Sequence, residues 1–346
     1  MSRRPFRSAA LGYLGGALLA TLTAASSAVL CAGAARAQDF TMKFATLTIN
    51  DVQHEFIKMY KTELEKTTNN RIKVEVYPAG QLGSAARQAE GLRLGTIEAA
   101  SGPAELFVGA DPRFQGLAMA GLFKDLAHVR SSVLVSQLRQ AVSEVAASRG
   151  LVLLGIIAFD TQSFAFKTPV TKLADFGGKR IRVLASEGEQ AQVNALGGAA
   201  VPMSLGEVLP ALTQGTIDGV NSGMPVFVAF KYYDGAPNVL DTHLWAIVTL
   251  NLVSKVWYDR LPADLKEAVM KAGATVEPEA NKWHATRLVQ DINTWKERGG
   301  KIATLSPAEQ QEAERRASAA IQPVLDKSAP LKEFYNKIKA AAATAK

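Results

Sequence analysis

The sequence predicts an α/β protein with doubly wound sheets, and three observations carry this prediction. Strand-like and helix-like segments alternate along residues 41–101 and again along residues 180–221, which is typical of parallel strands with helices on both faces. The chain has 346 residues, enough for two compact lobes. Its 48% hydrophobic and 21% charged residues match average globular usage, which excludes a disordered chain, a collagen-like fibre and a disulfide-stapled miniprotein.

The first stretch has the order strand, helix, strand, helix, strand. Val52, Phe56 and Tyr60 recur at helical spacing and predict an amphipathic helix. The strict alternation of apolar and polar residues from 72 to 76 predicts a strand. In chain order, the five predicted elements cover residues 42–46, 52–67, 72–76, 84–94 and 97–101.

The second stretch repeats this order with clearer capping signals. The predicted strands cover residues 180–185, 199–203 and 217–221. Between them lie two helices, each opened by a Ser-x-x-Glu capping box, Ser186 with Glu189 and Ser204 with Glu207. In doubly wound sheets ligands bind beyond the carboxyl ends of the strands, so we expect a binding site there.

The C-terminal part is predicted to be helical. Pro262 opens a helix that runs to Gly273, and Pro278 is interpreted as the first residue of a long helix that ends at Gly299. Ser306 caps a last helix. No linker rich in Pro, Gly or Ser interrupts the chain, so the lobes are expected to pack closely or to share elements.

Residues 1–37 have the pattern of an export signal. Arg3 and Arg4 precede an apolar run and a small-residue cleavage site at Ala37. The Ser-Arg-Arg-x-Phe opening favours the twin-arginine route, and an ordinary Sec signal with two arginines is the alternative. No later stretch has the length of apolar sequence that a transmembrane helix needs. We expect a soluble periplasmic protein, monomeric and cleaved near Ala37.

Charge and cysteine content exclude further classes. The leader holds four of the 39 basic residues and no acid, so 35 basic residues face 32 acidic ones in the mature chain. That near balance gives no argument for nucleic acid binding. Cys31 is the sole cysteine, and its loss with the leader excludes disulfides, a thiol nucleophile and a thiolate metal site.

No catalytic or metal-binding motif is found. The sequence contains no HExxH, GxSxG or GxGxxG motif and no phosphate loop. Asp51 and His54 could ligate a metal, but such residues at a helix entrance more often cap the helix or face solvent. We therefore expect no metal and no cofactor, and a binding protein rather than an enzyme.

Three ordered segments carry a family resemblance. They are YPAGQLG at 77–83 with GTIE at 95–98, GKRIRV at 178–183, and GGAAVPMSLGEVLPALTQGTIDG at 197–219. Together they resemble the DctP-type solute-binding proteins of the tripartite ATP-independent periplasmic (TRAP) transporters. KVW at 255–257 and LPADL at 261–265 also fit. The resemblance covers essentially the whole mature chain.

The resemblance implies a two-lobed periplasmic-binding-protein fold with a long helix spanning both lobes. Lobe I would hold residues 38–159 and about 248–287, lobe II residues 160–247, and residues 288–346 would form C-terminal helices packed across both. It also implies a protein that closes on a small organic acid and delivers it to the membrane subunits of a TRAP transporter.

Arg182 is the first candidate for the binding site. The family's main ligand contact falls on this residue, in the GKRIRV segment. Arg182 also lies near the carboxyl end of its strand, on the face opposite Ile181 and Val183. A guanidinium binds a carboxylate through two parallel hydrogen bonds. The alternative is that Arg180 and Arg182 are both solvated surface charge.

The remaining candidates follow from the resemblance and its departures. Gln162 stands about where many members carry a second arginine, Ser222 and Asn221 stand where the family has a ligand-binding asparagine, and Leu205 replaces an aromatic residue. With one cation fewer, a monocarboxylate with a hydrophobic or hydroxylated tail fits better than a dicarboxylate. Further candidates are expected on loops facing the cleft, although each is as readily structural: Asn50, Ser101, Phe227 and Trp245.

The sequence is also compatible with two other functions. A free-standing chemoreceptor could present the same ligand to a membrane sensor. An exported enzyme on this scaffold would need a nucleophile or an acid–base pair within reach of Arg182, and the sequence indicates none.

Overall fold

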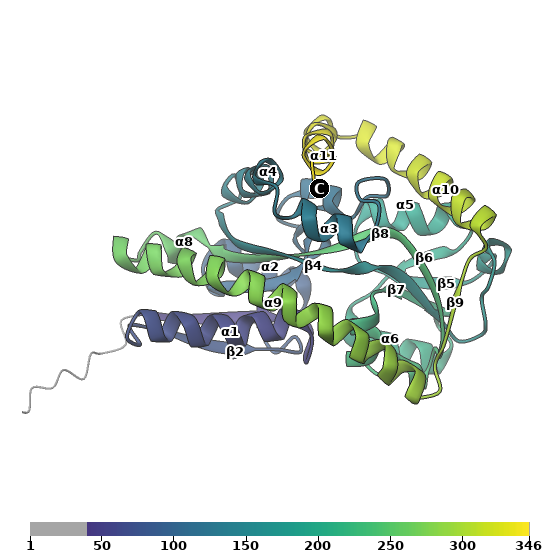
Figure 1. Ribbon diagram of the computed structural model, residues 1–346, viewed down its shortest axis with the longest axis horizontal. Coiled ribbons are helices and arrows are strands. Elements are labelled where there is room, and N and C mark those ends of the chain that lie inside the picture. The colour runs from purple at the N-terminus through teal and green to yellow at the C-terminus, as the bar shows by residue number, and fades with distance from the viewer. Residues whose placement is uncertain (1–39, 346) are drawn as a thin grey trace, which may run out of the picture. The chain divides into compact units, whose positions relative to one another are not determined.

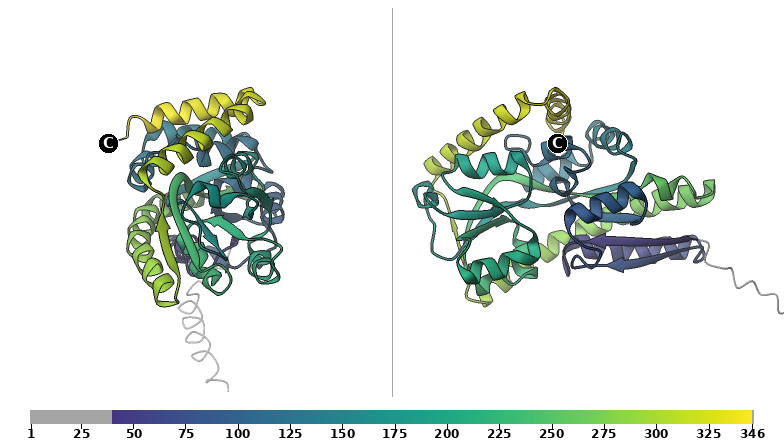
Figure 2. Two further views of the ribbon diagram at one scale, coloured as in Figure 1. Left: turned by 90° about the vertical axis from the view of Figure 1, so that its right-hand side faces the viewer. Right: turned by 180° about the vertical axis from the view of Figure 1, so that it is seen from behind.

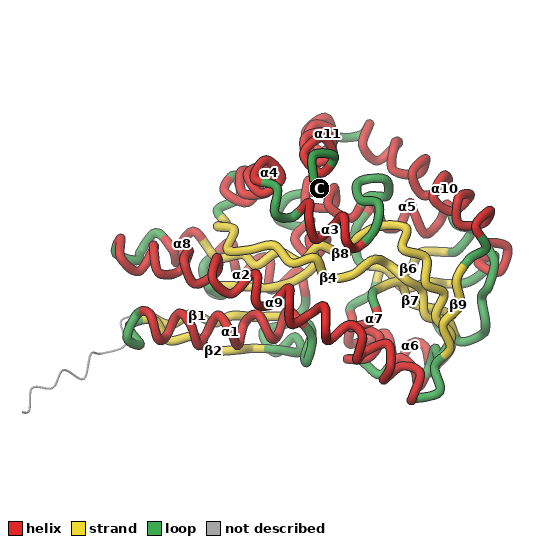
Figure 3. The backbone as a smooth tube through the Cα atoms, in the orientation of Figure 1, coloured by secondary structure: helices red, strands yellow, loops and turns green. Residues whose placement is uncertain are grey.

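The computed structural model describes residues 40–345, and within them nine strands form one mixed sheet (Figures 1 and 3). Its order is β2-β1-β3-β8-β4-β7-β5-β6, with β9 beside β8. The strands are β1 Phe40–Thr46, β2 Ile72–Tyr77, β3 Ala99–Pro103, β4 Leu151–Phe166, β5 Arg180–Val183, β6 Ala199–Pro202, β7 Gly219–Ser222, β8 Asn238–Ser254 and β9 Lys301–Thr304. The predicted α/β class is confirmed. The predicted export signal lies outside the described residues.

The long antiparallel strands β4 and β8 join two halves of this sheet, where separate sheets were predicted. β3 pairs with residues 249–253 of β8, whereas β7 pairs with residues 163–166 of β4. The pairing of β4 with β8 is irregular between these regions. Thr161 pairs with Ala246, but two residues later Ser163 pairs with Asp241, which lies five residues from Ala246 on β8. The predicted lobe boundaries fall inside these two strands, and the division into lobes stays a prediction.

Helices cover both faces of the sheet (Figure 2). One core cluster lies beneath α1, α6, α7 and α9, a second beneath α2, α4 and α11, and a third beneath α5 and α10. The α-helices are α1 Val52–Thr67, α2 Ala85–Leu94, α3 Leu126–Ser132, α4 Ser136–Ala147, α5 Glu187–Ala195, α6 Leu205–Gln214, α7 Met224–Ala229, α8 Lys255–Tyr258, α9 Ala263–Glu297, α10 Pro307–Asp326 and α11 Ala329–Ala342. The 3₁₀ helices are η1 Ala104–Phe107, η2 Pro112–Ala118, η3 Leu173–Phe176 and η4 Tyr232–Asp234. No helix among residues 40–345 is long and apolar enough to cross a membrane.

The predicted caps are largely found. Ser204 and Glu207 form a complete capping box at the start of α6. Ser186 accepts the Glu189 N–H, but the Glu189 carboxylate accepts the N–H of Leu184 and not that of Ser186, so this capping box is only half made. Asp51 accepts the N–H groups of residues 53 and 54 at the start of α1, which is the capping role that the sequence left as one alternative.

Two strands begin two residues later than predicted. After Gly95, the N–H of Ile97 still donates to the carbonyl of Gly91. In the same way, after Gly215 the N–H of Ile217 donates to the carbonyl of Ala211. These bonds close the preceding helices, so β3 and β7 start beyond them.

The C-terminal helices differ from the prediction in two ways. α9 is one continuous helix with Pro278 in its interior, where two helices were expected. A proline costs the helix one backbone hydrogen bond, but α9 packs along α1, β4 and α7, and this burial favours continuation. The predicted last helix is two, because Ser328 caps α11 after α10 has ended.

Candidate functional site

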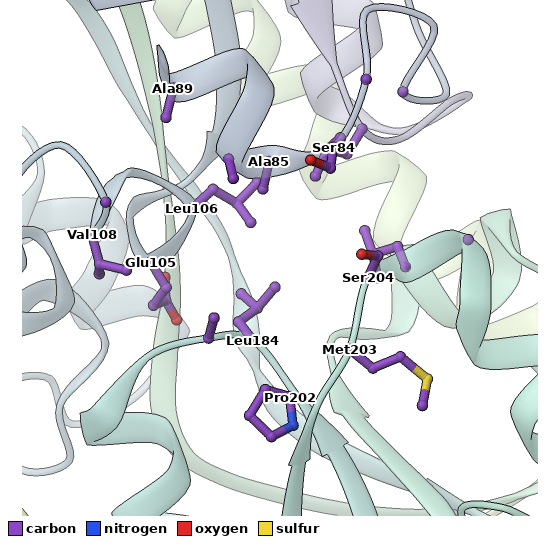
Figure 4. A pocket seen from close by; sticks show the side chains of 18 of the residues that line it. Ser84, Ala85, Ala89, Glu105, Leu106, Val108, Leu184, Pro202, Met203 and Ser204 are labelled. Carbon is purple, nitrogen blue, oxygen red and sulfur yellow. The ribbon is translucent and has the colours of Figure 1, made fainter.

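A cleft of about 1020 Å³ lies at the carboxyl ends of strands from both halves of the sheet (Figure 4). The half with β1 and β3 contributes the turn at Ala79, helix α2 and the η1 residues Glu105 and Leu106. The half with β5 and β6 contributes Arg182, Leu184 and residues 202–207. This is where doubly wound sheets bind ligands, so the cleft is the candidate site.

A smaller cavity of about 20 Å³ shares Arg182, Leu184 and Leu205 with the cleft. Its other lining residues include Thr48 and Ser222. Arg182 therefore borders both spaces.

Arg182 is a buried arginine, with 1% of its surface exposed. Its Nε donates to the carbonyl of Met203 at 2.9 Å, and its Nη1 makes a longer contact of 3.4 Å with the carbonyl of Asn221. Nη2 is buried and has no hydrogen-bond partner within the described part of the chain. Burial lowers the Arg182 pKa, yet an arginine stays protonated in proteins. Two backbone carbonyls thus fix the guanidinium and leave donors for an oxyanion.

Two buried carboxyl groups lie near this guanidinium. Glu105 is 2% exposed and Glu189 is 1% exposed. Burial raises the pKa of Glu105, the charge of Glu189 raises it further, and Arg182 opposes both. Burial also raises the pKa of Glu189, again against the effect of Arg182. Neither residue was among the predicted site residues.

The hydrogen bonding of the two carboxyl groups differs. Oε2 of Glu189 accepts the N–H of Leu184 at 2.9 Å. Oε1 of Glu189 and both side-chain oxygens of Glu105 are buried and have no partner from any other residue between 40 and 345. Glu105 is the more accessible to a ligand, because it lines the cleft and Glu189 does not.

The sequence did contain a signal for Glu105. Glu105 is an acidic residue within the largely apolar run from 99 to 110, and it lies just after the end of β3. Glu189 was interpreted only as a capping residue, so its burial beside a cleft arginine had no signal of its own.

The predicted site residues fall into three groups. Arg182, Leu205 and Ser222 line the cleft or the smaller cavity. Three others are buried near the sheet centre without lining either space, each with one polar atom lacking a partner among the described residues: Gln162, Asn221 and Ser101.

The last group lies apart from both spaces. Asn50 is exposed on the loop before α1. Phe227 packs against Trp295 with ring centroids 5.8 Å apart, and Trp245 packs against Phe164 at 6.1 Å. For Phe227 and Trp245 the packing fits the structural alternative that the sequence left open.

The charged groups of the cleft suit an organic ion better than a metal. Within residues 40–345, no group of three or more His, Cys, Asp or Glu side chains is arranged to hold a metal ion. A guanidinium beside apolar walls instead binds a carboxylate through charge-assisted hydrogen bonds.

Comparison with known proteins agrees with this geometry. A family model described as bacterial extracellular solute-binding protein, family 7 (DctP), matches residues 45–329. A solute-binding protein of Roseobacter denitrificans is 27% identical over 309 residues, covering 86% of this chain and 94% of that protein. The C4-dicarboxylate-binding periplasmic protein DctP of Rhodobacter capsulatus is 26% identical over 250 residues, 71% of this chain and 74% of that protein.

A solved structure is also similar. It is a TRAP periplasmic solute-binding protein of Xanthobacter autotrophicus Py2 with bound β-D-galacturonate, which has a TM-score of 0.79 and 27% sequence identity. The match covers 86% of this chain and 99% of that one.

Proposed function

This chain belongs to family 7 of the bacterial extracellular solute-binding proteins, the DctP family of TRAP transporters, and we propose that it captures a small organic acid in the periplasm and delivers it to TRAP membrane subunits. Similar proteins bind such acids, among them the galacturonate-bound protein of Xanthobacter autotrophicus. The observation that carries the proposal is the buried guanidinium of Arg182 at the cleft.

Arg182 anchors the carboxylate of the ligand. Its Nε is held by the carbonyl of Met203, and its Nη1 contacts the carbonyl of Asn221. Nη2 has no partner within residues 40–345, so Nη2 and the second N–H of Nη1 are available for a bidentate contact. Hydrogen bonds to a charged group are worth about 1.5–3 kcal/mol each. Because the backbone already fixes the guanidinium, little side-chain freedom is lost on binding.

Polar groups beside the anchor select the rest of the ligand. Ser222 lines the smaller cavity next to Arg182, and Gln162 and Asn221 each have a buried oxygen without a partner among residues 40–345. A wrong ligand leaves such groups unpaired, and an unpaired buried polar group costs about 1–3 kcal/mol. These residues discriminate among acids once the cleft has closed.

Closure occurs between lobe I, residues 38–159 with about 248–287, and lobe II, residues 160–247. The hinge is the irregular pairing of β4 with β8, where residues 242–245 have no counterpart in the β4 ladder. A ligand that contacts both lobes stabilises the closed state by its higher affinity for that state. The long helix α9, which contacts α1 and α7, spans both lobes.

Titration calorimetry on the mature protein tests the proposal. The probes are D-galacturonate, L-gulonate, succinate and further mono- and dicarboxylates, with D-galactose as an uncharged control. We expect at least one acid to bind and galactose not to bind. The Arg182→Ala variant should bind that acid at least a hundredfold more weakly.

Arg180→Ala is the matched control, because Arg180 lies two residues away on the same strand but is exposed and paired with Asp218. It should bind the acid as the wild type does. Tight binding by Arg182→Ala would remove the anchor from the proposal, and a panel with no binder would refute the proposed ligand class.

A further inference from the structure

Glu105 is a buried carboxyl group that the proposed anchor does not use. It lies in η1, directly after β3, and lines the cleft opposite Leu184 (Figure 4). Only 2% of its surface is exposed. Both side-chain oxygens lack a partner from any other residue in the described part of the chain. Burying a carboxylate without partners is costly, so a ligand that supplies donors to Glu105 gains a site already formed.

The buried charges of the site do not favour a simple anion. Arg182 brings one positive charge, whereas Glu105 and Glu189 bring two carboxyl groups, and all three side chains are almost fully buried. A ligand with only a carboxylate would add a third acidic group to a single cation. Burial already disfavours the ionised form of both carboxyl groups and a nearby cation favours it, so a ligand that also brings a positive charge fits better.

Part of the cleft wall is apolar. Leu106, Leu184 and Leu205 line the cleft together with Arg182 and Glu105. Such a wall contacts methylene groups favourably, at about 0.8 kcal/mol for each CH₂ buried. The cleft therefore offers an acceptor for a cation, apolar wall residues and a donor for an anion.

We propose, on the premise of the function proposed above, that the ligand is a zwitterion whose carboxylate binds Arg182 and whose protonated amine binds Glu105, with a short aliphatic spacer between them. An ammonium group carries three donors and a full positive charge, so it satisfies both oxygens of Glu105 and neutralises the carboxylate. A hydroxyl satisfies one oxygen and leaves the charge unbalanced.

Matched ligands that differ in one terminal group test the proposal. Calorimetry compares butyrate, 4-hydroxybutyrate and 4-aminobutyrate, and then the same three end groups on five-carbon and six-carbon acids. In at least one series, the amino acid should bind at least tenfold tighter than both partners. If no amino acid binds, or if none exceeds its methyl-terminated and hydroxyl-terminated partners, the zwitterion proposal is wrong.

Two variants assign the preference to Glu105. The amine preference is the ratio of the affinity for the amino acid to the affinity for its methyl-terminated partner. In Glu105→Gln this ratio should fall at least tenfold. It should persist in Glu187→Gln, which removes the same charge from an exposed position outside the cleft. An amine preference that survives in Glu105→Gln overturns the assignment, and the wild-type comparison decides the ligand class even if this variant fails to fold.

The outcomes separate this inference from the proposed function. If acids without an amine bind best and their binding requires Arg182, the carboxylate anchor stands and the zwitterion is refuted. If no carboxylate binds, the proposed function itself fails.

Discussion

Arg180 and Arg182 lie two residues apart on β5 and occupy opposite environments. Arg180 is exposed and its Nε lies 3.0 Å from a carboxylate oxygen of Asp218, whereas Arg182 is 1% exposed and bonds to two backbone carbonyls. The pair thus provides one structural and one candidate ligand-binding arginine on a single strand.

Removing the Arg182 charge should destabilise the protein more at high pH. Arg182 lowers the pKa of Glu105 and of Glu189, although burial keeps both above their ordinary values. A carboxyl group with a raised pKa in the folded state costs stability as the pH rises through that pKa. Without Arg182 this cost grows, so Arg182→Met should lose at least about 1.4 kcal/mol more at pH 8.5 than at pH 6, equivalent to one pKa unit.

Urea unfolding of the unliganded protein at both pH values measures this difference. Arg180→Met serves as the control, and the gap between it and the wild type should be the same at pH 6 and pH 8.5. An Arg182→Met penalty independent of pH would mean that the two carboxyl groups do not sense the guanidinium.

Leu205 should limit the length of the ligand. It lines both the cleft and the smaller cavity at the start of α6. Leu205→Phe adds volume to this wall and should weaken binding of the longest acid that the wild type accepts by at least tenfold, with less effect on shorter acids. Leu134→Phe makes the same change at an exposed site and should leave affinity as it is. Equal affinities in calorimetry would show that Leu205 does not contact the ligand.

His284 should make the fold sensitive to acid. It is 1% exposed on α9, and its Nε2 bonds to the carbonyl of Phe159. Burial lowers its pKa to about 4, below the ordinary value of about 6.5. A histidine with a depressed pKa stabilises the fold above its ordinary pKa and loses this contribution as the pH falls towards the folded value. By pH 4 this loss amounts to about 3 kcal/mol.

His284→Gln removes this titration and keeps a side-chain donor. At pH 7 the variant should be less stable than the wild type, and urea unfolding should show the gap closing between pH 6.5 and pH 4.5. Because both proteins share all other titrating groups, the difference isolates His284. A constant gap over this range would contradict a neutral, buried imidazole.

The sequence allowed Arg182 to be placed at the cleft, but it did not predict which side chains surround it. Arg182 lies in a motif and near a strand end, so both resemblance and strand geometry pointed to it. Glu105 belongs to no motif, and its burial depends on how η1 folds over the end of β3. The alternation of β5 predicted that Arg180 and Arg182 share a face, yet only one is buried, because exposure on a short strand depends on neighbouring segments.

The continuity of α9 illustrates the same limit. Pro278 predicts a helix start, and the bonds that favour an unbroken helix come from residues far away in sequence. Glu277, next to Pro278, accepts from Nη1 and Nη2 of Arg139 on α4 at 2.5 and 2.9 Å. It also accepts the N–H of Ile156 on β4 at 3.2 Å. Such contacts over more than a hundred residues have no signature in a local pattern.

Breaking this contact from the arginine side should be costly. The Glu277 side chain is 5% exposed and the Arg139 side chain 30% exposed, so Arg139→Met leaves a buried carboxylate without its partner, whereas the reverse change leaves an arginine that water can reach. Loss of one partner of a fully buried pair costs about 3–5 kcal/mol, but water reaches part of Arg139 and Glu277 keeps the N–H of Ile156. Arg139→Met should therefore destabilise the protein by about 1–3 kcal/mol, the cost of a buried acceptor that loses a partner, and Glu277→Met by less.

The double variant completes the test. When both charges are removed, no unpaired carboxylate remains, so Arg139→Met/Glu277→Met should be more stable than Arg139→Met alone. The coupling energy, the effect of the double variant minus the sum of the two single effects, should be at least about 1 kcal/mol in magnitude. Urea unfolding of the four proteins at one pH gives the coupling energy directly. Additive effects would mean that the two side chains act independently. Apolar packing alone would then keep α9 continuous at Pro278.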